Sequence, residues 1–194
     1  MTIQIWQNFY QRTMPLFTPQ AERFLDVIQP SRLNSVAFRY TFSVEAMTKI
    51  SYIIEDTVMG NPRVADTHVS FQYFSRLIPQ TSRYRNIASA AKHLWLYGAY
   101  DVPATSLGEF IQHPTTTLID TEQSPLLQYW YLVAYGPGVY KTLLAQEIPA
   151  LSGDERYYEG FYTFQPDVAY QMSAILHQLY PEQIPAPTAP ELLS

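Results

Sequence analysis

The chain has 194 residues, of which 47% are hydrophobic, 15% aromatic and 15% charged, and its formal net charge is −5. This apolar content excludes a largely disordered chain, and the length suits a single folded domain. The net negative charge argues against nucleic acid as a partner, because attraction to phosphates supplies most non-specific nucleic-acid affinity.

Cysteine is absent, which excludes disulfides, thiolate metal sites and thioether-linked chromophores, so any cofactor would be non-covalent. The four histidines show no metal-ligand spacing, and we predict no metal site. The first residues lack a basic segment followed by an apolar one, and no run approaches the roughly 20 apolar residues that span a bilayer. We therefore expect a cytoplasmic protein that does not cross a membrane.

Helix signals dominate the first sixty residues. Thr18 followed by Pro19 predicts a capped helix that ends at Pro30. Ser43 is the next candidate cap, and Gly60 with its neighbours predicts the end of that second helix. Between these two positions, apolar residues recur at steps of three or four, at Val44, Met47, Ile50, Ile54 and Val58.

The middle of the chain alternates between strand and helix patterns. Residues 68–74 alternate with period two and predict a strand, and Thr81 or Ser82 caps a predicted helix. Residues 93–100 and 126–135 are short, aromatic segments that favour buried strands, with a weaker strand at 116–119.

The Gly136-Pro137-Gly138 sequence predicts a turn from a strand into a helix over residues 139–148. Residues 157–164 favour another strand, and Pro166 opens the last predicted helix. The segment 181–194 contains several prolines, and we expect it to form an extended tail with little to pack.

These elements predict an α+β fold with a four- or five-stranded sheet, the central order β-α-β-β-α-β, and flanking helices. We divide the chain into an N-terminal helical segment at 1–40, a main domain at 41–180 and a proline-rich tail at 181–194. Whether the first forty residues complete the fold or add a contact surface stays open.

Four stretches resemble the DICT family, a sensory domain associated with diguanylate cyclases and two-component systems. They are residues 43–59, 71–101, 126–148 and 156–176, and they include the Arg83-Tyr84-Arg85 triplet and the 136–138 turn. The resemblance implies an α+β fold around a four-stranded sheet and a role in signalling, with light as one stimulus. It also implies many relatives in cyanobacteria and suggests a stand-alone member of cyanobacterial type.

Charged residues provide the first set of candidate binding residues. Arg83 and Arg85 flank Tyr84 at the start of a predicted helix, where a guanidinium group can hold a carboxylate or phosphate. Residues two apart on a helix point in different directions, so at most one arginine faces a common site. The alternative is that these arginines pair with acids such as Glu55 or Asp56 and stabilise the fold.

Aromatic rings provide the second set. On the predicted strands, Trp95 and Tyr97 share one face, and Trp130 lies on the face opposite Tyr135. If these strands are neighbours, one sheet face carries rings that could bind a flat ligand or a protein, although rings that simply fill a helix-covered core are the alternative. The candidate set also includes three residues near strand ends, Asp101, Gly136 and Gly138.

From these features we expect a non-enzymatic sensory or regulatory domain that signals through a separate protein partner and is able to bind a small molecule. The sequence lacks diguanylate cyclase, phosphodiesterase and histidine-kinase signatures, which favours an output through that partner. The alternative is an adaptor that docks on a larger photosynthetic or light-harvesting complex. An enzyme acting on a small anion through Arg83 and Arg85 ranks third.

Overall fold

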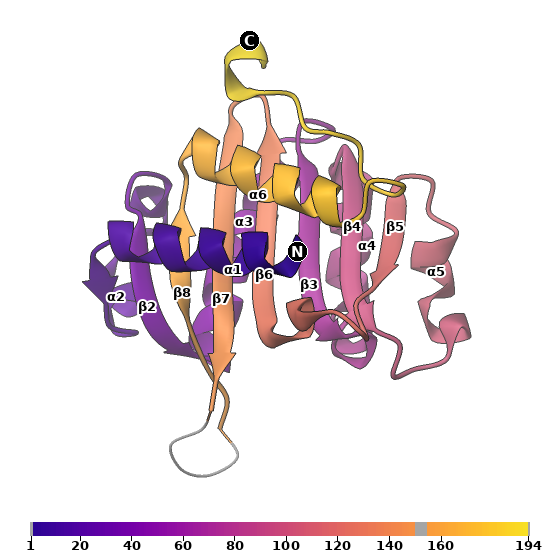
Figure 1. Cartoon of the computed structure of the whole chain (residues 1–194), viewed down its shortest axis with the longest axis horizontal. Helices are drawn as coiled ribbons and strands as arrows, with labels where there is room; N and C mark the ends of the chain where they lie inside the picture. The colour runs from indigo at the N-terminus through magenta and orange to yellow at the C-terminus, as the bar shows by residue number, and fades with distance from the viewer. Residues whose placement is uncertain (1, 150–154, 194) are drawn as a thin grey trace.

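The computed structural model describes residues 2–149 and 155–193, and this part of the chain forms one mixed sheet with helices on both faces (Figure 1). The strand order across the sheet is β1-β2-β8-β7-β6-β3-β4-β5. The strands are β1 Pro19–Gln20, β2 Phe38–Ser43, β3 Asp66–Tyr73, β4 His93–Ala99, β5 Thr116–Asp120, β6 Tyr129–Gly136, β7 Val139–Ile148 and β8 Tyr157–Thr163. The helices are α1 Thr2–Thr13, α2 Phe24–Val27, α3 Val44–Gly60, α4 Thr81–Ala90, α5 Gly108–Ile111 and α6 Pro166–Leu179.

Both parallel and antiparallel pairs occur in the sheet. Strands β2, β8, β7, β6 and β3 pair antiparallel in that order, and β4 and β5 extend the sheet in parallel from β3. Helix α4 connects β3 to β4, as a parallel pair requires a crossover. At the other edge, β1 pairs parallel with β2.

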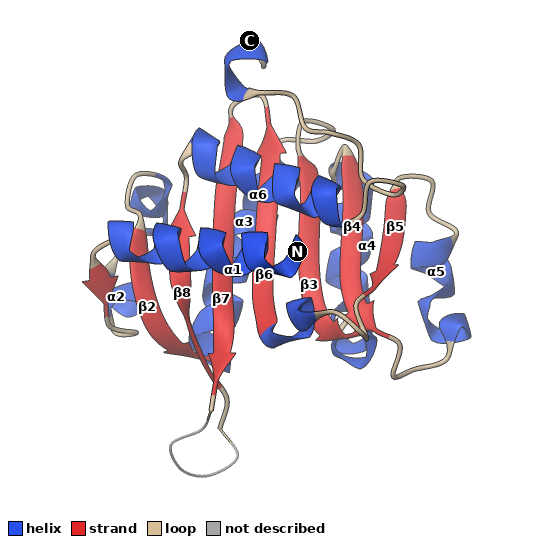
Figure 2. Ribbon diagram, in the orientation of Figure 1, coloured by secondary structure: helices blue, strands red, loops and turns tan. Residues whose placement is uncertain are grey.

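The sheet separates two hydrophobic cores. Helices α3 and α4 cover one face, and helices α1 and α6 cover the other (Figure 2). The alternating side chains of each central strand therefore enter different cores. Among the described residues, no helix is both long enough and apolar enough to cross a bilayer.

Helix α3 confirms the sequence prediction and positions the candidate site. The Ser43 hydroxyl accepts a hydrogen bond from the Ala46 amide at 3.4 Å, in the manner of an N-cap. The stripe Met47, Ile50, Ile54 and Val58 is fully buried against the sheet. The opposite face of the helix stays hydrated, so burial of one stripe fixes how α3 is rotated.

The prediction of a helix over residues 139–148 is wrong, because these residues form β7. Leu, Ala, Gln and Glu favour helices locally, but the segment lies between β6 and β8 and pairs with both. Residues Pro137 and Gly138 form a two-residue hairpin connection from β6, with Gly138 at a φ of 71°. Proline followed by a glycine with positive φ is typical of a type II turn.

The prediction of a helix from Thr18 to Pro30 is also wrong. Pro19–Gln20 forms β1, and only Phe24–Val27 is helical. The long N-terminal helix is α1, where Trp6, Phe9, Tyr10 and Thr13 are buried at helical spacing. The spacing of these residues is a sequence signal of the helix.

The C-terminal segment packs against the domain, contrary to the expectation of a tail with little to pack. Ile184 is 2% exposed. The indole of Trp95 donates to the Gln183 carbonyl at 3.0 Å, and the Tyr135 hydroxyl donates to the Thr188 carbonyl. Proline has no N–H group to donate, so a proline-rich segment leaves backbone carbonyls without partners of its own. Side chains on the sheet donate to two of these carbonyls.

The predicted α+β class is confirmed, but the sheet is larger than the four or five strands expected. Strands predicted at 68–74, 93–100, 116–119, 126–135 and 157–164 are present, whereas β1, β2 and β7 were missed. The second helix of the predicted central order is replaced by β7. Helix α4 begins at Thr81 as expected, but no side chain caps it.

Substituting Gly136 should destabilise the sheet. A Cβ atom at this position would lie 2.2 Å from the Val64 carbonyl oxygen, a backbone atom that cannot move aside without distorting the chain. We expect Gly136→Ala to lower the free energy of unfolding by about 1–3 kcal/mol in urea denaturation. Gly108→Ala is the matched control, because nothing lies within 4 Å of a Cβ atom there. Equal stability of the two variants would contradict the prediction.

Candidate functional site

The candidate site is a cavity of about 50 Å³ between α3, α4 and the sheet strands β3 and β6. Its walls combine aromatic and aliphatic side chains with hydroxyl, amide and charged groups. The lining residues are Thr48, Ser51, Tyr52, Glu55, Val69, Ser70, Phe71, Gln72, Arg76, Gln80, Tyr84 and Trp130. One water needs roughly 10–15 Å³ of such space, so the cavity has room for a few waters or a small polar molecule.

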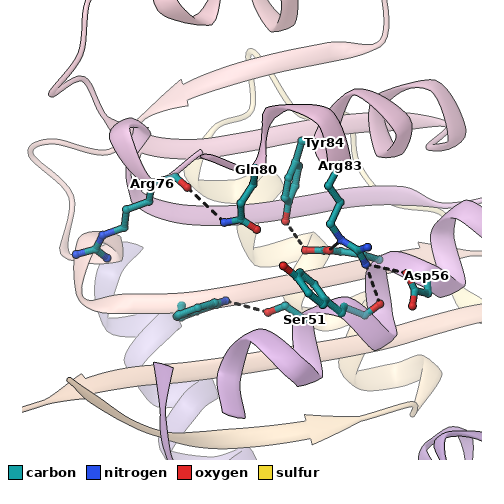
Figure 3. A network of polar contacts seen from close by, with 9 residues as sticks. Ser51, Asp56, Arg76, Gln80, Arg83 and Tyr84 are labelled. Carbon is teal, nitrogen blue, oxygen red and sulfur yellow. Dashed lines mark hydrogen bonds and ion pairs between the residues drawn. The ribbon is translucent and has the colours of Figure 1, made fainter. Parts of the chain in front are cut away.

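A buried carboxylate joins the two helices that border the cavity (Figure 3). The Glu55 side chain on α3 is 2% exposed. The Tyr84 hydroxyl on α4 donates to Glu55 Oε1 at 2.6 Å, and Arg83 Nε donates to Glu55 Oε2. Arg83 also donates to Asp56 Oδ1 at 2.8 Å, and its Cζ lies 4.0 Å from the centroid of the Tyr52 ring.

The two arginines of the triplet point in different directions, as their spacing predicts. Arg83 pairs with the acids of α3, which is the alternative to ligand binding that the sequence left open. Arg85 points away and forms an exposed ion pair with Glu109 on α5 at 2.9 Å. The structure therefore brings together Glu55, Asp56, Arg83 and Tyr84, and leaves Arg85 outside this network.

Burial controls the protonation of this network. It raises the pKa of Glu55, while the hydrogen bonds from Tyr84 and Arg83 and the arginine charge lower that pKa. Burial and then the nearby Glu55 carboxylate raise the pKa of Tyr84 well above its ordinary value. Tyr84 therefore keeps its proton and donates to Glu55, and the contact between the helices is charge-assisted.

Trp130 on β6 forms part of the cavity wall on the sheet side, together with Val69. Its indole Nε1 donates to the Ser51 hydroxyl at 3.2 Å, and its ring packs edge-on against Tyr158 with centroids 5.3 Å apart. Gln80 Nε2 donates to the Arg76 carbonyl oxygen at 3.3 Å and closes the side next to α4 (Figure 3). Both aromatic and hydrogen-bonding groups thus meet in one small space.

Gln72 is a site residue that the sequence analysis missed. Its φ is 62°, at a point in β3 where the register with β4 shifts, and it is 3% exposed. Its amide donates to the Leu127 carbonyl and to Glu147, and its oxygen accepts from Arg76 and Tyr158. A non-glycine residue in this region stores backbone strain, which such a fully bonded side chain can hold. No local sequence pattern marks this bulge.

Gln72 and Arg76 also border a larger, open hollow of about 740 Å³. This hollow lies beside the ends of β3 and β7 and residues 127–128, and Glu147, Glu155 and Arg156 are among its lining residues. Both signs of charge occur in it, so it has no single-sign field that would select an anion or a cation.

The aromatic surface expected from the sequence is a closed core. Trp95, Tyr97 and Tyr135 do share one face, but β3 separates β4 from β6, and helices α1 and α6 and the C-terminal segment cover them. These three residues are 2, 1 and 3% exposed. Trp130 lies on the other face, beside the cavity. The rings therefore fill a core and present no open platform for a flat ligand.

The remaining candidates lie outside the cavity lining. Asp101 follows β4 and accepts a hydrogen bond from the Ser75 amide at 2.8 Å. Gly136 and Gly138 belong to the β6–β7 hairpin, where a turn into a helix was expected. Across the described ranges, no cluster of three or more histidine, cysteine or acidic side chains is arranged to hold a metal ion.

The fold and the cavity define an α+β domain with a small, mixed polar and aromatic pocket beneath two joined helices. Residues 31–148 match the DICT family, described as a sensory domain in diguanylate cyclases and two-component systems. This range covers more than half of the chain, and the chain belongs to the DICT family. The match contains β2 through β7 and the whole cavity lining, and it ends before residues 156–176. No curated protein and no solved structure matches the chain.

Removing Arg83 should destabilise the protein, because it leaves the buried Glu55 carboxylate without its cation. Arg83→Met should lower the free energy of unfolding by about 2–3 kcal/mol, somewhat less than for a fully buried pair because Arg83 is partly exposed. Arg85→Met, two residues further along α4 and with an exposed partner, should cost no more than about 1 kcal/mol. Chemical denaturation of both variants tests the difference.

The double variant Glu55→Gln with Arg83→Met separates the ion pair from simple loss of packing. Removing both charges should recover part of the stability lost in Arg83→Met, because no unpaired charge then remains buried. Strictly additive effects of the two substitutions would show that the pair contributes no coupling.

Acid should destabilise the protein through His68. This residue is 2% exposed, stacks on Trp95 with centroids 4.5 Å apart, and hydrogen-bonds the Tyr97 hydroxyl at 2.7 Å. Burial, and then the charge of His93, lower the pKa of His68 from 6.5 to about 3. The unfolded chain therefore binds a proton that the native state refuses, and stability falls as the pH drops from 6.5 towards 3.

Between pH 7 and pH 5, His68 should contribute a loss of about 2 kcal/mol in the free energy of unfolding. His68→Phe keeps an aromatic ring on Trp95 and removes the titrating group, so its stability should depend less steeply on pH over this range. Denaturation curves at several pH values measure both slopes. Parallel slopes for the wild type and the variant would exclude His68 as the source.

Proposed function

We propose that this DICT domain is a non-catalytic sensor that binds a small molecule in the cavity between α3 and α4 and signals through a separate protein partner. The observation that carries this proposal is the position of the cavity beside the Glu55–Arg83 contact, which joins the two helices. A ligand in the cavity touches both helices and the sheet at once. Its binding is therefore coupled to how the helices sit on the sheet.

The coupling follows from differential affinity. A ligand shifts a conformational equilibrium only by the difference between its affinities for the two states. The cavity holds only a few atoms, so a ligand larger than its resting volume favours a state with α3 and α4 further apart. The Arg83 contacts with Glu55 and Asp56 resist that movement and set the energy that ligand binding has to supply.

The outer side of the same network supports a readout by a partner. The Asp56 side chain is 65% exposed, and Tyr52, under the Arg83 guanidinium, is 39% exposed. Arginine and tyrosine are enriched in protein interfaces, and a change in the helix contact would rearrange them at the surface. The inner side of the network meets the ligand, and the outer side meets the partner.

The lining supports a compact ligand with an apolar body and a few hydrogen-bonding groups. Trp130, Val69 and Phe71 offer apolar contact, and Ser51 and Gln80 offer hydrogen bonds. Light remains one stimulus that the family suggests. A tetrapyrrole or flavin in this cavity is not part of the proposal, because pockets for drug-sized ligands measure roughly 300–1,000 Å³.

Exposed tyrosines support the second candidate, an adaptor that docks on a larger assembly such as a photosynthetic complex. Tyr73 and Tyr100 are 40 and 43% exposed, in addition to Tyr52. An adaptor binds its partner whether or not the cavity is filled. A sensor changes its affinity for the partner when the ligand binds, so partner capture with and without ligand separates the two functions.

Filling the cavity should abolish ligand binding. The chain has three tryptophans, and among them Trp130 lines the cavity, so fluorine NMR of protein labelled with 5-fluorotryptophan gives one reporter and two internal references. In a screen of small organic acids, amines, alcohols and nucleobases, we expect a compound that shifts the Trp130 signal and raises Tm. Thr48→Leu should remove both effects by placing bulk in the cavity.

Thr57→Leu is the matched control, because Thr57 also lies on α3 and also donates its hydroxyl to the carbonyl four residues earlier, but lines a different cavity. It should bind the hit compound with unchanged affinity. The proposal fails if hits bind Thr48→Leu as well as they bind the wild type, or if they shift the signals of Trp6 and Trp95 instead.

A further inference from the structure

Lys141 on β7 is a buried cation outside the candidate site. It is 5% exposed and points to the α3 side of the sheet, on the same face as its strand neighbours Val139 and Leu143. Lysine is rarely buried to this degree unless an anion accompanies it, since removing an ammonium group from water is costly. Throughout residues 2–149 and 155–193, however, no carboxylate forms an ion pair with Lys141.

The contacts of the ammonium group are neutral. Lys141 Nζ donates to Asn34 Oδ1 and, at 3.1 Å, to the hydroxyl of Tyr162, which itself donates to the Leu33 carbonyl at 2.8 Å. An ammonium group has three hydrogens, so these two contacts leave one donor. Burial lowers the pKa of Lys141 to about 8, which still leaves the group mostly charged at pH 7.

An open cavity of about 290 Å³ has Lys141 in its lining. Lys141 and Asn34 line it together, with Thr57 from α3 and the apolar side chains of Val139 and Phe164. Because Asn34 accepts from Lys141 through Oδ1, its Nδ2 lies on the same amide and is a second donor beside the ammonium group. Two neighbouring donors match the two oxygens of a carboxylate.

We propose that this cavity binds the carboxylate of a small organic acid, held by Lys141 Nζ and Asn34 Nδ2, with the apolar part of the acid against Val139 and Phe164. The bound anion supplies the countercharge that the protein itself does not provide for Lys141. This site is separate from the cavity next to Glu55, and the proposal stands whether or not that cavity is the sensory site. Helix α3 borders both cavities, through Thr48 in one and Thr57 in the other.

Acetate titration of the intact chain tests the site, with the lysine side-chain signals and backbone amides followed by NMR. We expect saturable shifts at Lys141 and Gly138, at millimolar acetate, and a rise in the pKa of Lys141 when acetate is bound. Lys141→Met should weaken acetate binding at least tenfold. Lys92→Met is the control, because Lys92 is exposed and pairs with Asp66, and this variant should bind acetate normally.

Asn34→Asp keeps the test decisive if Lys141→Met does not fold. It places a carboxylate where Asn34 already accepts from Lys141, so it should raise Tm and abolish acetate binding because the protein then carries its own anion. Sodium chloride at equal ionic strength tests the chemical class. Absence of saturable acetate binding, equal binding by Lys141→Met, or equal competition by chloride would each overturn the proposal.

Discussion

The carboxylate of Glu55 lies inside the protein, and a buried carboxylate is stable only where donors surround it. Both of its side-chain donors, Arg83 and Tyr84, come from the first turn of α4. Helix α4, which connects β3 to β4, is therefore held beside α3. Ser51 on α3 and Ser70 on β3 are the smallest residues of the cavity lining. The cavity lies beside this contact, between the joined helices and the sheet.

The two faces of the sheet have different physical roles. On the face of α1 and α6, rings pack edge to face, as Trp6 does with Tyr129 and Tyr131. On the other face, β3 is distorted at Gln72, whose side chain connects Arg76 to Glu147 and hence links the α4 side to the β7–β8 side. Rigid packing on one face gives the strained and polar elements of the other face a fixed support.

Elements with a complete local signal were predictable from the sequence. Helix α3 has a cap, an apolar stripe and a terminating glycine, and β4 and β6 are short aromatic segments typical of buried strands. Strand β7 was missed because its residues favour helix and its partners are distant in sequence, so only the pairing with β6 and β8 decides its structure. At the site, the Arg83 and Glu55 pairing was one of two open alternatives, and geometry resolves it. Gln72 carried no signal, because a bulge depends on the register between strands.

Among the described residues, two buried charges lie on the α3 face, and their surroundings differ. Arg83 and Tyr84 donate to Glu55, so the charge of Glu55 is balanced within the fold. Removing this charge would therefore mainly change the stability of the protein. Lys141 receives only an amide oxygen and a hydroxyl, although it is buried almost as deeply. An aspartate in place of Asn34 would give Lys141 a countercharge and stabilise the fold. Asn34 already contacts Lys141, and aspartate differs from asparagine only in the terminal group of its side chain. A neutral residue at that position leaves the positive charge available, and a buried charge that remains available is a means of recognising an ion from solution.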